Sequence, residues 1–199
     1  MRPFGPRVAR TAERLAVVAG WTLLGLAVLV TFEIFARKFF RFSVQGADEI
    51  GGYVLALSSA IGFCYALVQR AHIRIDLLLP RLPSTVQAVL NLLTFGLLAI
   101  FAGLLAWRAV AVAVESWALS ARAPTPLGTP LVLPQGIWAF ALSAFALLCG
   151  LALVRGLAAL WAHRADEVAR DLGPSSIQNE LDAELADARR RGVAAESET

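Results

Sequence analysis

An apolar run from Ile50 to Val68 limits what this chain can fold into more than any other feature of its sequence. It consists of apolar and small residues, with charged residues only beyond its two ends. Because a helix rises about 1.5 Å per residue, this run and its flanks are long enough to cross a hydrocarbon core about 30 Å thick. The segment therefore predicts a transmembrane helix.

Three further apolar runs are long enough to do the same, and together they predict an all-α membrane protein with four transmembrane helices. The composition agrees, since 58% of the 199 residues are hydrophobic, whereas a soluble domain has about 45–50%. A single transmembrane domain is expected at residues 15–163, with helices at about 15–36, 47–69, 86–119 and 135–161.

Composition and motifs argue against several other classes of protein. The net charge is only +3 and the basic residues lie beside apolar runs, which is not the footprint of a nucleic-acid-binding protein. No nucleophile–base set, metal-ligand spacing or glycine-rich phosphate loop indicates an enzyme. Cys64 and Cys149 fall inside predicted helices and are expected to act as small buried hydrophobic residues.

Lysines and arginines near the helix ends predict the orientation in the membrane, because cytoplasmic loops carry an excess of them. The basic segment 1–14 and the polar, partly disordered tail 164–199 are both expected in the cytoplasm. That side then holds Arg2, Arg7, Arg10, Arg14, Arg70, Arg74, Arg81, Arg155, Arg164 and Arg170, against Arg37, Lys38, Arg41 and Arg122 on the other. The sequence thus predicts cytoplasmic N and C termini.

The predicted second helix has charged residues beyond both ends. Asp48 and Glu49 fall in its first turn, where the helix dipole favours negative charge, so they are either structural or part of an outward-facing surface. His72, Arg74 and Asp76 follow its other end. A helix places His72 and Asp76 on one face, whereas a strand places all three there. Either geometry gives an amphipathic segment at the membrane surface.

Small residues and one acid–base pair are further candidate features. Gly52, Ala56 and Ala60 recur every four residues and predict the close approach of a neighbouring helix. Glu33 stands four residues before Arg37, an order that favours an ion pair on one helix face. Because an acid within a membrane is also a candidate for an ion pathway, both roles stay open for Glu33.

The order of these features resembles the small, Q-type membrane subunit of tripartite ATP-independent periplasmic (TRAP) transporters. The resemblance covers roughly residues 10–163: four helices, an arginine closing the first, an acid pair opening the second and His-Ile-Arg-Ile-Asp after it. Its most specific residues are Arg37, Asp48, Glu49, Gly62, His72, Ile73, Asp76 and Pro83.

The resemblance implies a division of labour among three proteins. A periplasmic binding protein captures the solute, usually an organic acid anion, and a large membrane subunit holds the solute and sodium sites. The small subunit packs against the large one and offers part of the surface on which the binding protein docks. This chain is therefore expected to be a non-enzymatic subunit of the bacterial inner membrane without a cofactor, sodium coupling being the task of the large subunit.

The candidate partner-interface residues lie on the second helix and at its flanks. The second helix and the cluster after it are expected to meet the large subunit, and the acid pair and outer loops to lie towards the binding protein. The residues are Arg37, Asp48, Glu49, Gly52, Ala56, Ala60, His72, Arg74 and Asp76.

Two alternative functions compete with this interpretation. A haem-bearing membrane anchor of a dehydrogenase would need His72 and His163 as iron ligands, yet both follow helices that end on the same predicted side. A self-contained small carrier would place Glu33 or Glu115 on its ion path.

Overall fold

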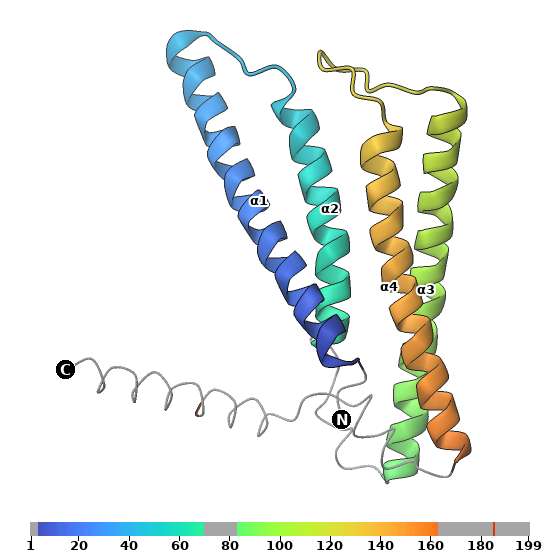
Figure 1. Cartoon of the computed structure of the whole chain (residues 1–199). Coiled ribbons are helices and arrows are strands. Elements are labelled where there is room, and N and C mark those ends of the chain that lie inside the picture. The colour runs from blue at the N-terminus through green and yellow to red at the C-terminus, as the bar shows by residue number, and fades with distance from the viewer. Residues whose placement is uncertain (1–3, 70–82, 163–184, 186–199) are drawn as a thin grey trace, which may run out of the picture.

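The computed structural model describes residues 4–69 and 83–162 together with Leu185, and it contains four long helices (Figure 1). They are α1 (Pro6–Phe40), α2 (Ala47–Val68), α3 (Ser84–Ala118) and α4 (Val132–Trp161). Each is long and apolar enough to cross a membrane. Within the described ranges there is no β-strand. The all-α membrane architecture predicted from the apolar runs is thus confirmed.

Helix α1 is much longer than the apolar run that predicts it. Its 35 residues correspond to about 52 Å of helix, whereas the hydrocarbon core of a bilayer is about 30 Å thick. It begins at Pro6, which suits the first helical position because the amide proton that proline lacks would have no partner there. Helix α1 therefore projects beyond the hydrocarbon at its ends.

The helices pack in the order α1, α2, α4, α3. Helix α2 packs along both α1 and α4, and α4 also packs along α3, as the arrangement in Figure 1 shows. On α1 only Ala12, Ala19, Glu33 and Ala36 are buried. Three of these recur at intervals of seven or fourteen residues, which is typical of a narrow contact seam. Most of the surface of α1 is therefore left uncovered by the other described helices.

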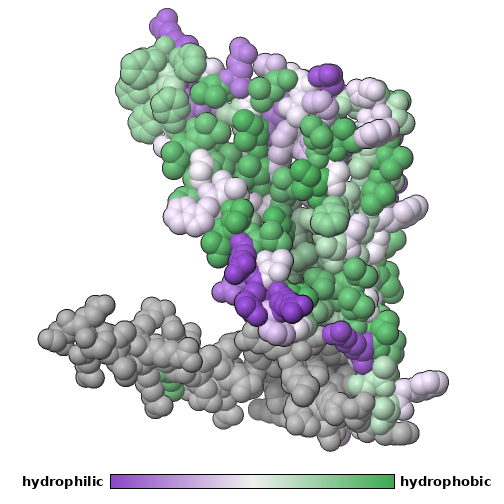
Figure 2. Space-filling view, in the orientation of Figure 1, coloured by the Kyte–Doolittle hydropathy of each residue, from purple (hydrophilic) through white to green (hydrophobic). Residues whose placement is uncertain are grey.

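The exposed surface of the helices is strongly apolar. Figure 2 shows hydrophobic side chains along their length and hydrophilic ones gathered nearer the ends. Many large apolar side chains are mostly exposed, among them Trp21 at 69% and Phe140 at 76%. Apolar area of this extent on a folded protein marks contact with lipid or with another protein.

Small residues line the contact between α2, α3 and α4. Ala60, Ala109 and Ala139 are 0%, 1% and 4% exposed and form one cluster with Leu142. The hydrophobic effect does not favour association of helices inside a bilayer. The close approach of their backbones at small residues is therefore a main source of affinity between membrane helices. Ala60 is thus a packing residue of the helix group itself.

The two cysteines lie in the same helix group and are both free. Cys149 is fully buried in the larger core cluster, beside Phe95 and Phe145. The thiol of Cys64 donates a weak hydrogen bond to the backbone oxygen of Ala141 across the α2–α4 contact, at 3.7 Å. Both behave as small residues packed between helices, as the sequence predicts.

Enlarging Ala60 is expected to destabilise the helix group. Ala60→Leu adds three carbon atoms where no space exists, and overpacking of this kind costs about 1–3 kcal/mol. Ala158→Leu, at an exposed position of α4, is the matched control and should change little. The measurement is the unfolding free energy in mixed micelles; equal stabilities for the two variants would contradict the packing described above.

Candidate functional site

The connection from α1 to α2 and the loop from α3 to α4 lie at the same end of the helix group (Figure 1). The first comprises residues 41–46 and the second residues 119–131, which we call the outer loop. Helix α2 starts there after Gly46, whose φ of 91° is a left-handed conformation that glycine adopts without strain. No side chain caps this helix start. The first turn of α2 is therefore available for contacts with the outer loop.

The carboxylate of Glu49 joins this first turn to the outer loop. Glu49 is 8% exposed, and one of its oxygens, Oε1, accepts a hydrogen bond of 2.7 Å from the hydroxyl of Tyr53. Its other oxygen, Oε2, accepts one from the hydroxyl of Thr125. Thr129 of the outer loop also lies close to this carboxylate. Because hydrogen bonds to an ionised acceptor are stronger than neutral ones, Glu49 anchors the loop.

A second contact between loop and helix start is steric. A Cβ atom at Gly46 would overlap the side chain of Leu127. The loop therefore packs directly on the backbone of residue 46, at a position where the left-handed conformation independently favours glycine. Leu127 still remains 50% exposed and forms part of the outer surface of this end.

The outer loop satisfies many of its own backbone groups. The amide of Ala123 donates to the oxygen of Thr129 and that of Leu131 to the oxygen of Ala121, both at 3.0 Å. The guanidinium of Arg122 donates to the oxygen of Gly128 at 3.1 Å. The loop is thus a hydrogen-bonded hairpin-like turn.

Helix α3 ends in a tight turn that sets the direction of this loop. Ser120 has a left-handed φ of 48°, and its amide donates to the oxygen of Trp117 at 3.1 Å. The next amide, that of Ala121, donates to Ser116 at 2.9 Å. This pair of bonds is the Schellman arrangement, which usually has glycine in the left-handed position.

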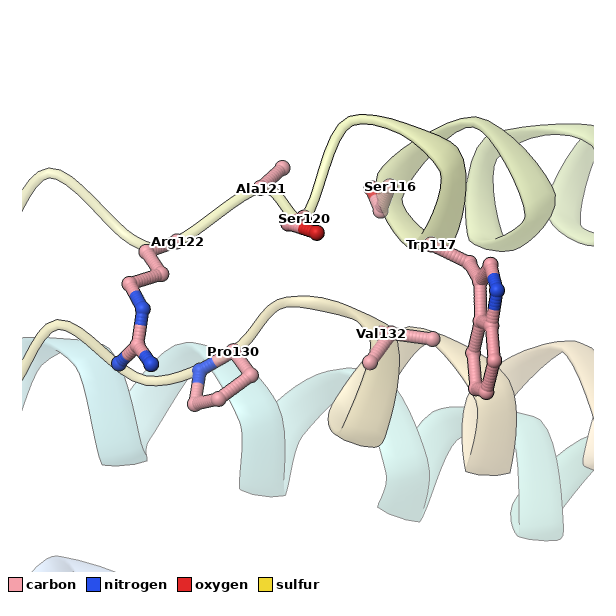
Figure 3. Close-up of a pocket in the computed structure, with 7 residues that line it drawn as sticks. All are labelled: Ser116, Trp117, Ser120, Ala121, Arg122, Pro130 and Val132. Atoms are coloured by element: carbon pink, nitrogen blue, oxygen red, sulfur yellow. The ribbon is translucent and has the colours of Figure 1, made fainter.

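A pocket of about 380 Å³ lies between the end of α3 and the start of α4. Figure 3 shows the indole of Trp117 beside Val132 at one end of it and Arg122 beside Pro130 at the other. A smaller pocket of about 90 Å³ between α2 and α4 is lined by Tyr53 and Trp138 among others. Neither pocket is lined by an acid, and no group of three or more metal-ligating side chains occurs among the described residues.

The acid pair divides into a buried and an exposed member. The side chain of Asp48 is exposed, whereas that of its neighbour Glu49 is buried by the loop. Both lie in the first turn of α2, where the helix dipole favours them. Asp48 is therefore available to a partner at this end, and Glu49 is occupied by contacts within the chain.

Glu33 and Arg37 lie on one face near the end of α1, 3.9 Å apart. Glu33 is 7% exposed and also accepts a hydrogen bond of 3.3 Å from the hydroxyl of Ser43. The guanidinium side of the pair is 63% exposed. Glu33 and Arg37 thus form an ion pair near the end of α1. The hydrogen bond from Ser43 to Glu33 holds the α1–α2 connection against α1. The other acid considered for an ion path, Glu115, is exposed on α3.

The predicted small-residue stripe of α2 faces more than one environment. Ala60 is buried against α3 and α4, and Ala56 lines the smaller pocket beside α4. Gly52 is exposed, and a Cβ there would meet nothing. It is Gly51 that faces α1, where a Cβ would contact Leu26 at 3.6 Å. Of the stripe, Gly52 alone presents an uncovered small surface.

The remaining candidates lie outside the described residues. These are His72, Arg74 and Asp76, together with His163 of the haem alternative. Conversely, sequence reasoning did not identify Thr125, Leu127 and Thr129 as partners of the α2 start. The only available signal was that a carboxylate at a membrane helix end needs donors, which does not say where in the chain they lie.

One family model matches this chain. It is described as tripartite ATP-independent periplasmic transporters, DctQ component, and it matches residues 26–159. The matched range includes the Glu49 contacts and the whole outer loop. No curated protein and no solved structure matches the chain.

Removing the carboxylate of Glu49 is expected to release the outer loop. Glu49→Ala leaves the hydroxyl donors of Tyr53 and Thr125 without their acceptor, so amide hydrogen exchange in residues 119–131 should accelerate at least about tenfold. Asp48→Ala, which removes the neighbouring exposed acid, is the matched control. Unchanged exchange in the Glu49 variant would show that the loop is held by other contacts.

Gly46 is expected to tolerate alanine less well than Gly128 does. Both have a left-handed backbone, which costs an L-residue about 1–2 kcal/mol, but a Cβ meets Leu127 only at Gly46. Gly46→Ala should therefore destabilise the protein more than Gly128→Ala, and adding Leu127→Ala should remove the excess. A double-mutant cycle of unfolding free energies measures this; zero coupling between positions 46 and 127 would refute the contact.

Proposed function

We propose that this chain supports the large transport subunit of a TRAP transporter and helps to dock the periplasmic binding protein. The chain belongs to the DctQ component family of these transporters and is their small membrane subunit. The complex would carry out sodium-coupled uptake of an organic acid or a similar solute across the bacterial inner membrane. In this scheme the solute and sodium sites belong to the large subunit, and this chain needs no cofactor of its own.

The uncovered surface of α1 is the observation that carries the supporting role. Among the described helices, α1 packs extensively along α2 alone, and four of its residues are buried. A self-contained carrier encloses its ion and solute path between helices, whereas the candidate acid Glu33 here is bound to Ser43 and Arg37. A helix group this open favours a role as one layer of a larger assembly.

The anchored outer loop supports the docking role. A docking surface loses less conformational entropy in each binding event if it is already held in place before the partner binds. Glu49 and Leu127 hold the loop on α2, and exposed Asp48 and Arg122 lie at the same end. We assign the binding-protein contact to this end, and the contact with the large subunit to α2 and the segment that contains His72 and Asp76.

Transport is expected to require all three proteins. Vesicles that hold this chain and the large subunit should accumulate solute when a sodium gradient and the binding protein are present. Vesicles that hold either membrane subunit alone should not, because one lacks the transport sites and the other its support. The measurement is uptake of labelled solute. Sodium-driven uptake by this chain alone, or full uptake without it, would contradict the proposal.

The docking role requires the outer loop to face the periplasm. An alkaline phosphatase reporter fused after Arg122 should therefore be active, because this enzyme works only outside the cytoplasm, and a fusion after Arg14 should be inactive. The paired activities in intact cells measure the orientation. The reverse pattern would place both termini outside and exclude this docking surface.

A further inference from the structure

The end of α1 carries exposed aromatic and basic side chains, of which only Arg37 has been given a role above, in its ion pair with Glu33. We call residues 35–42 the α1 tip; it contains Phe35, Arg37, Lys38, Phe39, Phe40, Arg41 and Phe42. The four phenylalanines are 57%, 66%, 81% and 60% exposed. The tip lies at the edge of the helix group that is remote from α3 (Figure 1). An exposed surface that combines this many aromatic and basic side chains indicates contact with a partner.

The depth of the tip follows from the length of the apolar run before it. Residues 15–36 contain no basic residue and only one acid, Glu33, and they span about 33 Å of helix, close to the thickness of the hydrocarbon core. The next turn, with Arg37, Lys38 and Arg41, therefore lies at the level of the lipid headgroups. Phe35, within the apolar run, lies beside the part of the acyl chains nearest the headgroups, and Phe39, one turn later, stacks on it.

The basic side chains of the tip lie within five residues of the chain and are all exposed. Arg37 and Lys38 are in the last turn of α1, and Arg41 is the residue after the helix, with a left-handed φ of 52°. Two guanidinium groups and one ammonium group are thus concentrated at one helix end, and guanidinium groups bind phosphate with paired hydrogen bonds.

The aromatic side chains form the apolar side of the same surface. The rings of Phe35 and Phe39 stack with centroids 5.9 Å apart, and the ammonium of Lys38 lies 5.9 Å from the ring of Phe39. Among the described residues, neither Lys38 nor Arg41 has an acidic partner in a salt bridge. A ligand with an anionic head and an apolar body matches both parts of the tip at once.

The distribution of charge along α1 gives a second reason to expect such a ligand. Arg7, Arg10 and Arg14 lie near one end of the helix and the three cations of the tip at the other. One of these ends must be on the translocated side of the membrane, where lysine and arginine are disfavoured. An anionic ligand at the tip offsets that penalty by neutralising the cations.

We infer that the α1 tip binds the headgroup phosphate of an anionic glycerophospholipid, with Arg37, Lys38 and Arg41 on the phosphate and the stacked Phe35 and Phe39 along the acyl chains. A lipid fits better than an acidic protein because Phe35 lies within the apolar run 15–36, at hydrocarbon depth, where no soluble partner reaches. The inference depends only on the membrane location of the chain and not on its role in transport.

The test uses the full chain in nanodiscs of phosphatidylcholine with a minority of phosphatidylglycerol. Native mass spectrometry counts the phosphatidylglycerol molecules retained per protein. Each basic residue near a membrane surface changes lipid affinity about fivefold, so Arg41→Gln should lower the preference for phosphatidylglycerol by about that factor. Replacing all three cations by glutamine should abolish it.

Two further variants make the result specific to the tip. Arg122→Gln removes one exposed cation at the same end of the helix group but outside the tip, and should lower the preference much less than Arg41→Gln does. Arg37→Lys with Arg41→Lys keeps the charge and should retain most of it. The inference is overturned if the triple glutamine variant keeps the wild-type preference or if Arg122→Gln lowers it as much as Arg41→Gln does. Loss of binding-protein affinity in the triple variant, with lipid preference intact, would instead assign the tip to that protein.

Discussion

The hydrocarbon interior of a bilayer offers backbone groups no water, and this constraint governs the whole structure. Every amide and carbonyl there needs a partner within the protein, which a helix provides by itself. Helices α1 to α4 meet the requirement, and the irregular segments 41–46 and 119–131 lie at their ends (Figure 1). Even there, the outer loop pairs the amides of Ala123 and Leu131 internally. The loop is thus ordered by the same need that makes the helices.

Glu49 is the polar counterpart of the small-residue packing between helices. Helices α2 and α4 meet at Ala60 and Ala139 within the membrane region. The hydrogen bond from Thr125 to Glu49 joins the two helical hairpins, α1–α2 and α3–α4, a second time at one end. Because these contacts lie at different depths, they fix the relative tilt of the hairpins. The acid in the first turn of α2 and the contact between Gly46 and Leu127 together hold the outer loop, residues 119–131, in position.

Helix α1 differs from the other three in how little of it is covered. A membrane helix with a narrow contact seam presents most of its surface to lipid or to another protein. The proposed role as one layer of a larger membrane assembly accounts for this exposure. The tip of α1 requires a different explanation, because its exposed cations, Arg37, Lys38 and Arg41, occupy the last turn and the residue beyond it, at headgroup depth.

The sequence by itself determined the class of protein, the number of membrane helices and the family. These follow from the length and apolarity of the runs and from the order of residues such as Arg37, Asp48 and Glu49, all of which are local along the chain. The helix ends were less predictable. Helix α1 begins at Pro6 and not near residue 15, because a helix continues into polar residues wherever its backbone hydrogen bonds can form. For His72, Arg74 and Asp76 the sequence remains the sole source of the interface hypothesis.

Only the tertiary structure decided which acid of the pair is buried and what holds the outer loop. Thr125 lies 76 residues from Glu49 in the chain, and no periodicity links them, because a hydrogen bond depends on proximity in space after the hairpins have packed. The same holds for Gly46 and Leu127, and for the fate of the small-residue stripe, where Ala60 is buried and Gly52 is left open. A helical pattern states which residues share a face, but the neighbours of that face depend on how whole helices pack.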